Sequence, residues 1–231
     1  ASMTKIMTAL LTIENLPDLN ETITVPEDIF EELTAQDASV AGFNPYEQPT
    51  VRDLLYGVLL PSGADACETL ARAVGGSEEG FVAMMNQKAE ELGLTNTHFE
   101  NCTGLHNDNH YSTCRDIAVL MSECLKSDTF REIVTREVYT TEATASHPEG
   151  ITLYDTMLHR FTSYEMSTTL ENGAVIEGGK TGFTDEAGQC LVSFAEYGGE
   201  EYILVTAEAM TDSGSAVDSI ADASTVYGRL Q

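Results

Sequence analysis

The chain has 231 residues, enough for one large domain or for two lobes that share a cleft. Its acidic residues outnumber the basic ones by 38 to 11, which gives a formal net charge of −27 at pH 7. This charge repels nucleic-acid backbones and anionic lipid surfaces, and we interpret it as a solvated acidic surface. Hydrophobic residues make up 42% of the chain, which predicts a sizeable core and excludes a disordered protein.

Helices dominate the first part of the chain. Hydrophobic residues at helical spacing predict a helix over 4–14, and a polar stretch over 15–49 then holds short strand-like pieces such as 22–25. A capping-box-like pair, Thr50 and Asp53, starts the next helix. Further helices are expected over 65–74, 77–92, 113–125 and 129–135, with a polar loop at 95–112.

Strand signals follow. Segments rich in β-branched residues indicate strands at 137–141, 151–154 and 174–179. The segments 189–197 and 202–207 flank Gly198-Gly199, which predicts a β-hairpin, and a closing helix is expected over 213–230. This order of elements predicts an α+β fold rather than alternating βαβ units.

The five cysteines show neither a CxxC pair nor the spacing of zinc ligands. Most have apolar neighbours, so we expect reduced, mostly buried thiols, which hint at a low-oxygen habitat. The five are Cys67, Cys102, Cys114, Cys124 and Cys190. No apolar run in the given sequence is long enough to span a bilayer, and we expect any signal peptide to lie outside it.

The first chemical motif pairs Ser2 with Lys5 at the start of a helix. A spacing of three residues puts both side chains on one helical face. A lysine with a lowered pKa can take the proton of a serine nucleophile, and the helix N-terminus can stabilise an oxyanion. Taken alone, so short a motif is more often an ordinary capped helix.

Two further motifs complete the set. Ser62-Gly63-Ala64 lies at the break between two apolar helices. The serine hydroxyl at such a position can relay a proton, or it can simply cap the second helix. Lys180-Thr181-Gly182 ends a predicted strand, where it can bind a carboxylate and let a peptide lie close. A nucleotide-binding P-loop is rejected there, because Ala174 stands where that motif needs glycine and a strand follows instead of a helix.

In this order the three motifs are the signature of penicillin-binding proteins and serine β-lactamases. Over nearly the whole chain, the surrounding residues resemble the low-molecular-mass D-alanyl-D-alanine carboxypeptidases. The matching segments are 1–10, 50–57, Leu60-Pro61-Ser62-Gly63, 96–99, 103–106, 110–113 and 178–188.

The resemblance implies a single transpeptidase-like catalytic domain over 1–231, with a helical lobe packed on an antiparallel sheet and the active site between two lobes. Ser2 would attack the carbonyl between the two D-alanines of a peptidoglycan stem peptide, with Lys5 as general base. Ser62 would pass a proton to the departing D-Ala, and Lys180 would supply positive charge. Penicillins and other β-lactams would acylate Ser2, and no metal or organic cofactor is implied.

The family pattern also assigns substrate contacts. Thr181 would hold the terminal carboxylate, Gly182 would admit the extended peptide, and the backbone N–H groups of Ser2 and Phe183 would form the oxyanion hole. Ala64 stands at a substrate-positioning site where the family usually has asparagine. The ammonium groups of Lys5 and Lys180 would share one cleft and repel each other, so one of the two lysines should be neutral near pH 7. We expect the neutral one to be Lys5.

Other departures concern the ends of the family pattern. An arginine that many members place near the substrate carboxylate is missing from 210–213. The family has strands before the nucleophile helix, and this chain does not include them, so the sheet should have fewer strands than usual. We expect the natural protein to extend toward a signal peptide and to act outside the cytoplasm, at the cell surface or in the periplasm. The C-terminal β-rich domain and membrane-associating helix common in the family are not in this chain.

Two other functions stay open at this point. A serine β-lactamase needs a base to hydrolyse the penicilloyl ester, and Glu165 and Glu171 lie in the right interval without a matching context. A catalytically impaired penicillin- or peptidoglycan-binding module is the other alternative, because Ala64 and the abrupt start could prevent turnover. Release of D-Ala and the lifetime of a penicillin adduct distinguish the three.

Overall fold

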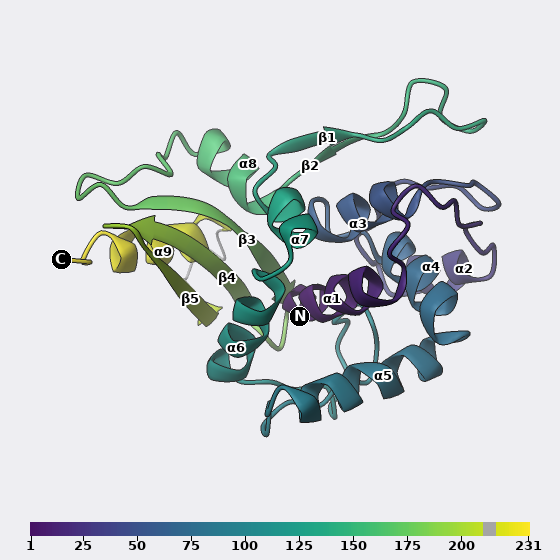
Figure 1. The fold of residues 1–231 in the computed structure, drawn as a ribbon, viewed down its shortest axis with the longest axis horizontal. Helices are drawn as coiled ribbons and strands as arrows, with labels where there is room; N and C mark the ends of the chain where they lie inside the picture. The colour runs from purple at the N-terminus through teal and green to yellow at the C-terminus, as the bar shows by residue number, and fades with distance from the viewer. Residues whose placement is uncertain (210–215) are drawn as a thin grey trace.

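A computed structural model describes residues 1–209 and 216–231 of the chain. Its first half is helical, and a three-stranded antiparallel sheet follows (Figure 1). The helical elements are η1 (Ser2–Thr4), α1 (Lys5–Asn15), α2 (Ile29–Ala35), α3 (Val51–Leu59), α4 (Ala64–Gly75), α5 (Glu78–Glu91), α6 (Cys114–Cys124), α7 (Asp128–Val134), α8 (Thr156–Ser163) and α9 (Val217–Tyr227). The strands are β1 (Val138–Thr140), β2 (Thr152–Tyr154), β3 (Val175–Thr184), β4 (Gly188–Tyr197) and β5 (Glu200–Ala209).

The large sheet runs in the order β3-β4-β5 and is covered on both faces. Because side chains alternate along a strand, Leu191 and Ala195 of β4 face α8 and α9 in one hydrophobic cluster. Val192 and Phe194 belong to a larger cluster that extends into the helical lobe. The sheet is therefore the wall between two cores, and the start of α1 lies where the lobe meets β3 and β4 (Figure 1).

The predicted α+β fold is confirmed, and so are most of its elements. Thr50 and Asp53 form a complete capping box at the start of α3. The hairpin at Gly198-Gly199 joins β4 to β5, and the loop at 95–112 lies between α5 and α6. The strand segments at 137–141 and 151–154 form a separate two-stranded sheet, β1-β2.

Some expectations differ from the structure. The helices α2 and α8 were not predicted. The piece at 22–25 is not a named strand, although it pairs with 46–50 through a bridge between Thr22 and Thr50 and through backbone hydrogen bonds such as that from Val25 N–H to the Glu47 carbonyl at 2.9 Å. The closing helix begins at Val217, and the part of its expected range at 213–215 lies outside the described residues. Residues 210–213, from which the family's arginine is absent, also lie outside the described residues.

Four of the five cysteines are buried, as expected, and Cys114 is exposed. Within the described residues, no helix is both long and apolar enough to cross a membrane.

Candidate active site

The start of the first helix brings Ser2 and Lys5 together. Ser2 opens the short helix η1, and the Lys5 amine donates a hydrogen bond of 3.0 Å to the Ser2 hydroxyl. The Lys5 side chain is buried, and this burial lowers the pKa of its amine. A buried amine with a lowered pKa, bonded to a serine hydroxyl, is the arrangement that activates a serine nucleophile.

A second contact fixes the Lys5 amine from behind. It donates a hydrogen bond of 2.6 Å to the backbone carbonyl of Thr103, in the loop between α5 and α6. The side-chain oxygen of Asn101 shapes this turn, accepting from the backbone N–H groups of Thr103 at 3.3 Å and Gly104 at 2.7 Å. The Thr103 carbonyl is thus a further functional group, and no residue-type pattern in the sequence pointed to it.

Ser62 lies at the break between α3 and α4, in an uncommon backbone conformation. Its φ of +67° is in the left-handed region, which strains a residue with a side chain. Its hydroxyl is buried and has no hydrogen-bond partner among the described residues. A buried hydroxyl without a partner is costly in a resting protein, so it suits a group that binds or relays a proton when substrate arrives.

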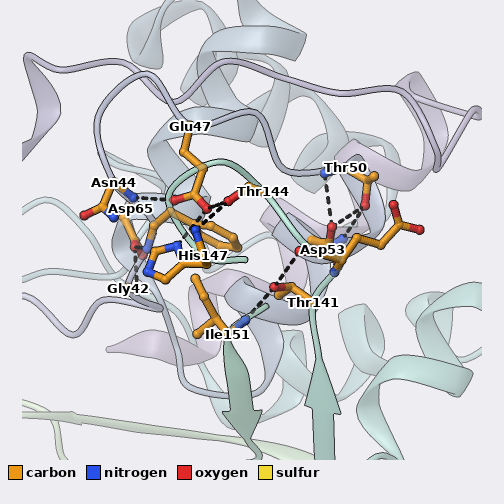
Figure 2. Close-up of polar contacts among 12 residues, drawn as sticks. Gly42, Asn44, Glu47, Thr50, Asp53, Asp65, Thr141, Thr144, His147 and Ile151 are labelled. Carbon is orange, nitrogen blue, oxygen red and sulfur yellow. Dashed lines mark hydrogen bonds and ion pairs between the residues drawn. The ribbon is translucent and has the colours of Figure 1, made fainter. Parts of the chain in front are cut away.

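The carboxylate of Asp65 binds the backbone of residues 41–43, which lie beside the turn at Ser62. We call residues 41–43 the collar loop, and Figure 2 shows its contact between Gly42 and Asp65. One oxygen accepts from the backbone N–H groups of Ala41 at 2.7 Å and Ala66 at 3.0 Å. The other accepts from Gly42 and Phe43, both at 3.0 Å. Burial raises the pKa of Asp65, and these four donors oppose that increase. The collar loop therefore stabilises the first turn of α4, directly after Ser62.

Lys180 lies on β3 and is fully buried. Its amine donates a hydrogen bond of 3.1 Å to the carbonyl of Thr181. Burial lowers the pKa of Lys180, and the positive charge of Lys5 lowers it further, whereas buried Asp155 raises it. Because the pKa of both lysines is lowered, the expectation that Lys5 is the neutral member stays a prediction.

Gly182 brings β3 against the nucleophile. A Cβ atom at Gly182 would lie 2.9 Å from the backbone nitrogen of Ser2 and 3.2 Å from that of Met3. Only glycine permits this approach, so the strand with Lys180 and Thr181 packs directly on η1. The next residue, Phe183, is 52% exposed beside this contact.

The remaining predicted residues lie around the same junction. Ala64 is the first residue of α4 and is buried. Thr181 is also buried, and its hydroxyl lies 2.6 Å from that of Thr156 at the start of α8. Neither Thr156 nor Asp155 was singled out from the sequence, since neither belongs to one of the three motifs.

Glu165 and Glu171 are both exposed. Among the described residues, no hydrogen bond or ion pair connects either of them to Ser2 or Ser62. They therefore lack the placement of a base that would activate water at an ester on Ser2.

A separate cluster has the composition of a metal site. Ligand atoms of Glu68, Glu78 and Cys102 lie within 4.8 Å of one another. Burial and then the charge of Glu78 raise the pKa of Glu68 to about 8. A protonated Glu68 near pH 7 removes the repulsion between the two carboxylates, so a shared proton accounts for the cluster.

Comparison with known proteins adds an independent result. A family model described as D-alanyl-D-alanine carboxypeptidase, peptidase S11, matches residues 1–211. The chain is 35% identical to D-alanyl-D-alanine carboxypeptidase DacF of Bacillus subtilis, covering 91% of this chain and 51% of that protein. It is 37% identical to the D-alanyl-D-alanine carboxypeptidase of Streptomyces sp. strain K15, with coverage of 87% and 69%.

A solved structure, the Streptomyces K15 DD-transpeptidase, superposes with a TM-score of 0.82 at 32% identity and covers 99% of this chain and 86% of its own. The chain spans about half the length of DacF and of DacC of Escherichia coli, to which it is 34% identical, with 51% of each covered. The motifs, the fold and these matches agree: the chain belongs to the peptidase S11 family of D-alanyl-D-alanine carboxypeptidases.

Proposed function

We propose that residues 1–231 form the single catalytic domain of a serine-type D-Ala-D-Ala carboxypeptidase, which removes the terminal D-Ala of peptidoglycan stem peptides through an acyl-serine intermediate. The observation that carries this proposal is the 3.0 Å hydrogen bond between Ser2 and the buried amine of Lys5. Family membership supports the substrate class.

Acylation begins with the proton of Ser2. A neutral Lys5 amine takes this proton while the serine oxygen attacks the carbonyl carbon between the two D-alanines. The negative charge that develops on the carbonyl oxygen is stabilised by the backbone N–H groups of Ser2 and Phe183. The hydroxyl of Ser62 gives a proton to the leaving amine and takes one from the lysine pair, so D-Ala departs as a neutral amine.

Substrate binding depends on β3. Thr181 donates a hydrogen bond to the terminal carboxylate of the substrate. The positive charge of Lys180 attracts the same carboxylate. Gly182 leaves room for an extended peptide along the strand. Ala64 offers only a methyl group where the family usually has an amide, so the remaining contacts must position the substrate backbone.

The acyl-enzyme is then resolved by an acceptor. Water gives carboxypeptidase activity, whereas an amine gives transpeptidation, the activity in the name of the Streptomyces K15 structure. A β-lactam also acylates Ser2 to form an ester. This ester is hydrolysed slowly, because the opened ring stays attached to the acyl group in the active site. The exposed positions of Glu165 and Glu171 weigh against a serine β-lactamase.

The proposed place of action is outside the cytoplasm, at the cell surface or in the periplasm, where peptidoglycan lies. The acidic surface, with a net charge of −27, disfavours nucleic-acid partners. The proposed partners are stem peptides that end in D-Ala-D-Ala and β-lactam antibiotics.

The test combines two measurements on the same protein. Mass spectrometry of the intact chain with a penicillin should show one adduct, and a peptide that ends in D-Ala-D-Ala should release D-Ala. Both should be lost in Ser2→Ala and kept in Ser77→Ala, a matched control whose hydroxyl caps α5 away from the site.

An adduct that persists in Ser2→Ala means that another residue is the nucleophile. An adduct without release of D-Ala favours the impaired binding module, and rapid loss of the adduct favours a β-lactamase.

A further inference from the structure

The first residue of α8 contacts the strand that carries the proposed substrate site. The hydroxyl oxygens of Thr156 and Thr181 are 2.6 Å apart, within the range of O–H···O hydrogen bonds. Thr181 is buried, and Thr156 is partly exposed. This contact connects β3 to an element outside all three sequence motifs.

The backbone around Thr156 fixes the position of its hydroxyl. Its N–H donates a hydrogen bond of 3.1 Å to the carbonyl of Leu60, two residues before Ser62. The preceding residue, Asp155, is buried and caps α8 by accepting from the N–H groups of Met157 at 2.9 Å and Leu158 at 2.7 Å. Thr156 therefore lies between the segment that leads to Ser62 and the strand that carries Thr181.

The chemistry of two bonded hydroxyls fixes the direction of the proton. A hydroxyl has one hydrogen to donate and two lone pairs that accept. If Thr181 donates its hydrogen to a substrate carboxylate, its contact with Thr156 must be one in which Thr156 donates. A donor behind Thr181 also polarises its O–H group, so the bond to the carboxylate becomes stronger.

We propose that Thr156 is a positioning residue for substrates with a free carboxylate, acting through Thr181 to hold that hydroxyl in the donating orientation. This inference rests on the proposed function, in which Thr181 binds the terminal carboxylate. The hydroxyl pair thereby discriminates for a carboxylate and against a C-terminal amide or ester.

The test uses Thr156→Val, which removes the hydroxyl at nearly constant volume, with Thr156→Ser as the conservative variant. The second-order rate of Ser2 acylation is measured with a penicillin and with its methyl ester, which lacks the free carboxylate. We expect the rate with the penicillin to fall about five- to tenfold in Thr156→Val, and the rate with the ester to fall much less. Thr156→Ser should restore most of the preference for the free carboxylate.

A double-mutant cycle makes the same point. If Thr156 acts through Thr181, Thr156→Val should add little to the effect of Thr181→Val. Should Thr156→Val unfold, Thr156→Ala takes its place, because it opens space and adds no bulk.

Three results overturn the inference. They are an unchanged rate with the penicillin, an equal loss with penicillin and ester, and independent effects of the two variants. A wild-type chain that forms no adduct overturns the proposed function and this inference with it. A wild-type chain that acylates normally, with equal losses in Thr156→Val, overturns this inference alone.

Discussion

Asp65 and Asp53 offer a matched pair of perturbations, because each buried carboxylate accepts four hydrogen bonds. Figure 2 shows the carboxylate of Asp65 beside Gly42 and that of Asp53 beside Thr50. Asp65 binds the collar loop beside Ser62, whereas Asp53 caps the opposite end of α3 and binds the β1 segment. We expect Asp65→Asn to weaken both the fold and the reaction, and Asp53→Asn to weaken the fold alone.

The magnitude follows from the lost acceptors. Asparagine keeps one oxygen and replaces the other by an NH₂ group, so two of the four backbone donors lose their acceptor, and at least one of these two lies in the collar loop. A hydrogen bond to a charged group contributes about 1.5–3 kcal/mol, which predicts a loss of about 3–6 kcal/mol in the free energy of unfolding. For a chain of this size, that corresponds to a decrease in Tm on the order of 10 °C.

The reaction is affected because the collar loop holds the turn at Ser62. A displacement of about 1 Å in a catalytic group costs on the order of 10²-fold in rate, so acylation by a penicillin should slow about 10- to 100-fold in Asp65→Asn. Thermal denaturation and the rate of adduct formation are measured on both variants at a temperature where each is folded. Equal slowing in Asp53→Asn would refute the reasoning, because the effect would then be general loosening.

Three further predictions concern the lysine pair and the thiols. The acylation rate should pass through a maximum with pH, since attack needs a neutral Lys5, whose pKa burial lowers, whereas carboxylate binding needs a charged Lys180, whose pKa burial and the Lys5 charge lower to about 7; a flat pH–rate profile contradicts this. Lys5→Ala should slow acylation about 10²- to 10⁴-fold while the circular dichroism spectrum is unchanged. Thiol counting on denatured protein without reductant should find all five cysteines free, and a lower count would reveal a disulfide.

Local signals explain which elements could be predicted from the sequence. The capping box at Thr50 and the turn at Gly198-Gly199 act within a few residues, so their patterns are visible in the chain itself. The helix α8 has a local signal as well, since Asp155 is an N-cap residue and the buried Met157 and Phe161 are four residues apart, but its eight residues are too few for this pattern to stand out in the sequence. Its stability comes from packing on β3 and α9, which are far away in the sequence.

The site divides in the same way. Ser2, Lys5, Ser62 and Lys180 could be proposed because their side chains define short motifs. The Thr103 carbonyl could not, since every residue has a carbonyl and only the fold brings this one to Lys5 across 98 positions. Thr156 meets Thr181 by a contact over 25 positions, which no spacing rule indicates.

The left-handed backbone at Ser62 has a consequence for how such chains diverge. This conformation costs a residue with a side chain about 1–2 kcal/mol, and glycine adopts it without strain. Selection for thermal stability therefore favours glycine at this position, whereas selection for turnover retains the serine hydroxyl. A natural variant with glycine here would mark a lineage that has abandoned catalysis and kept the scaffold.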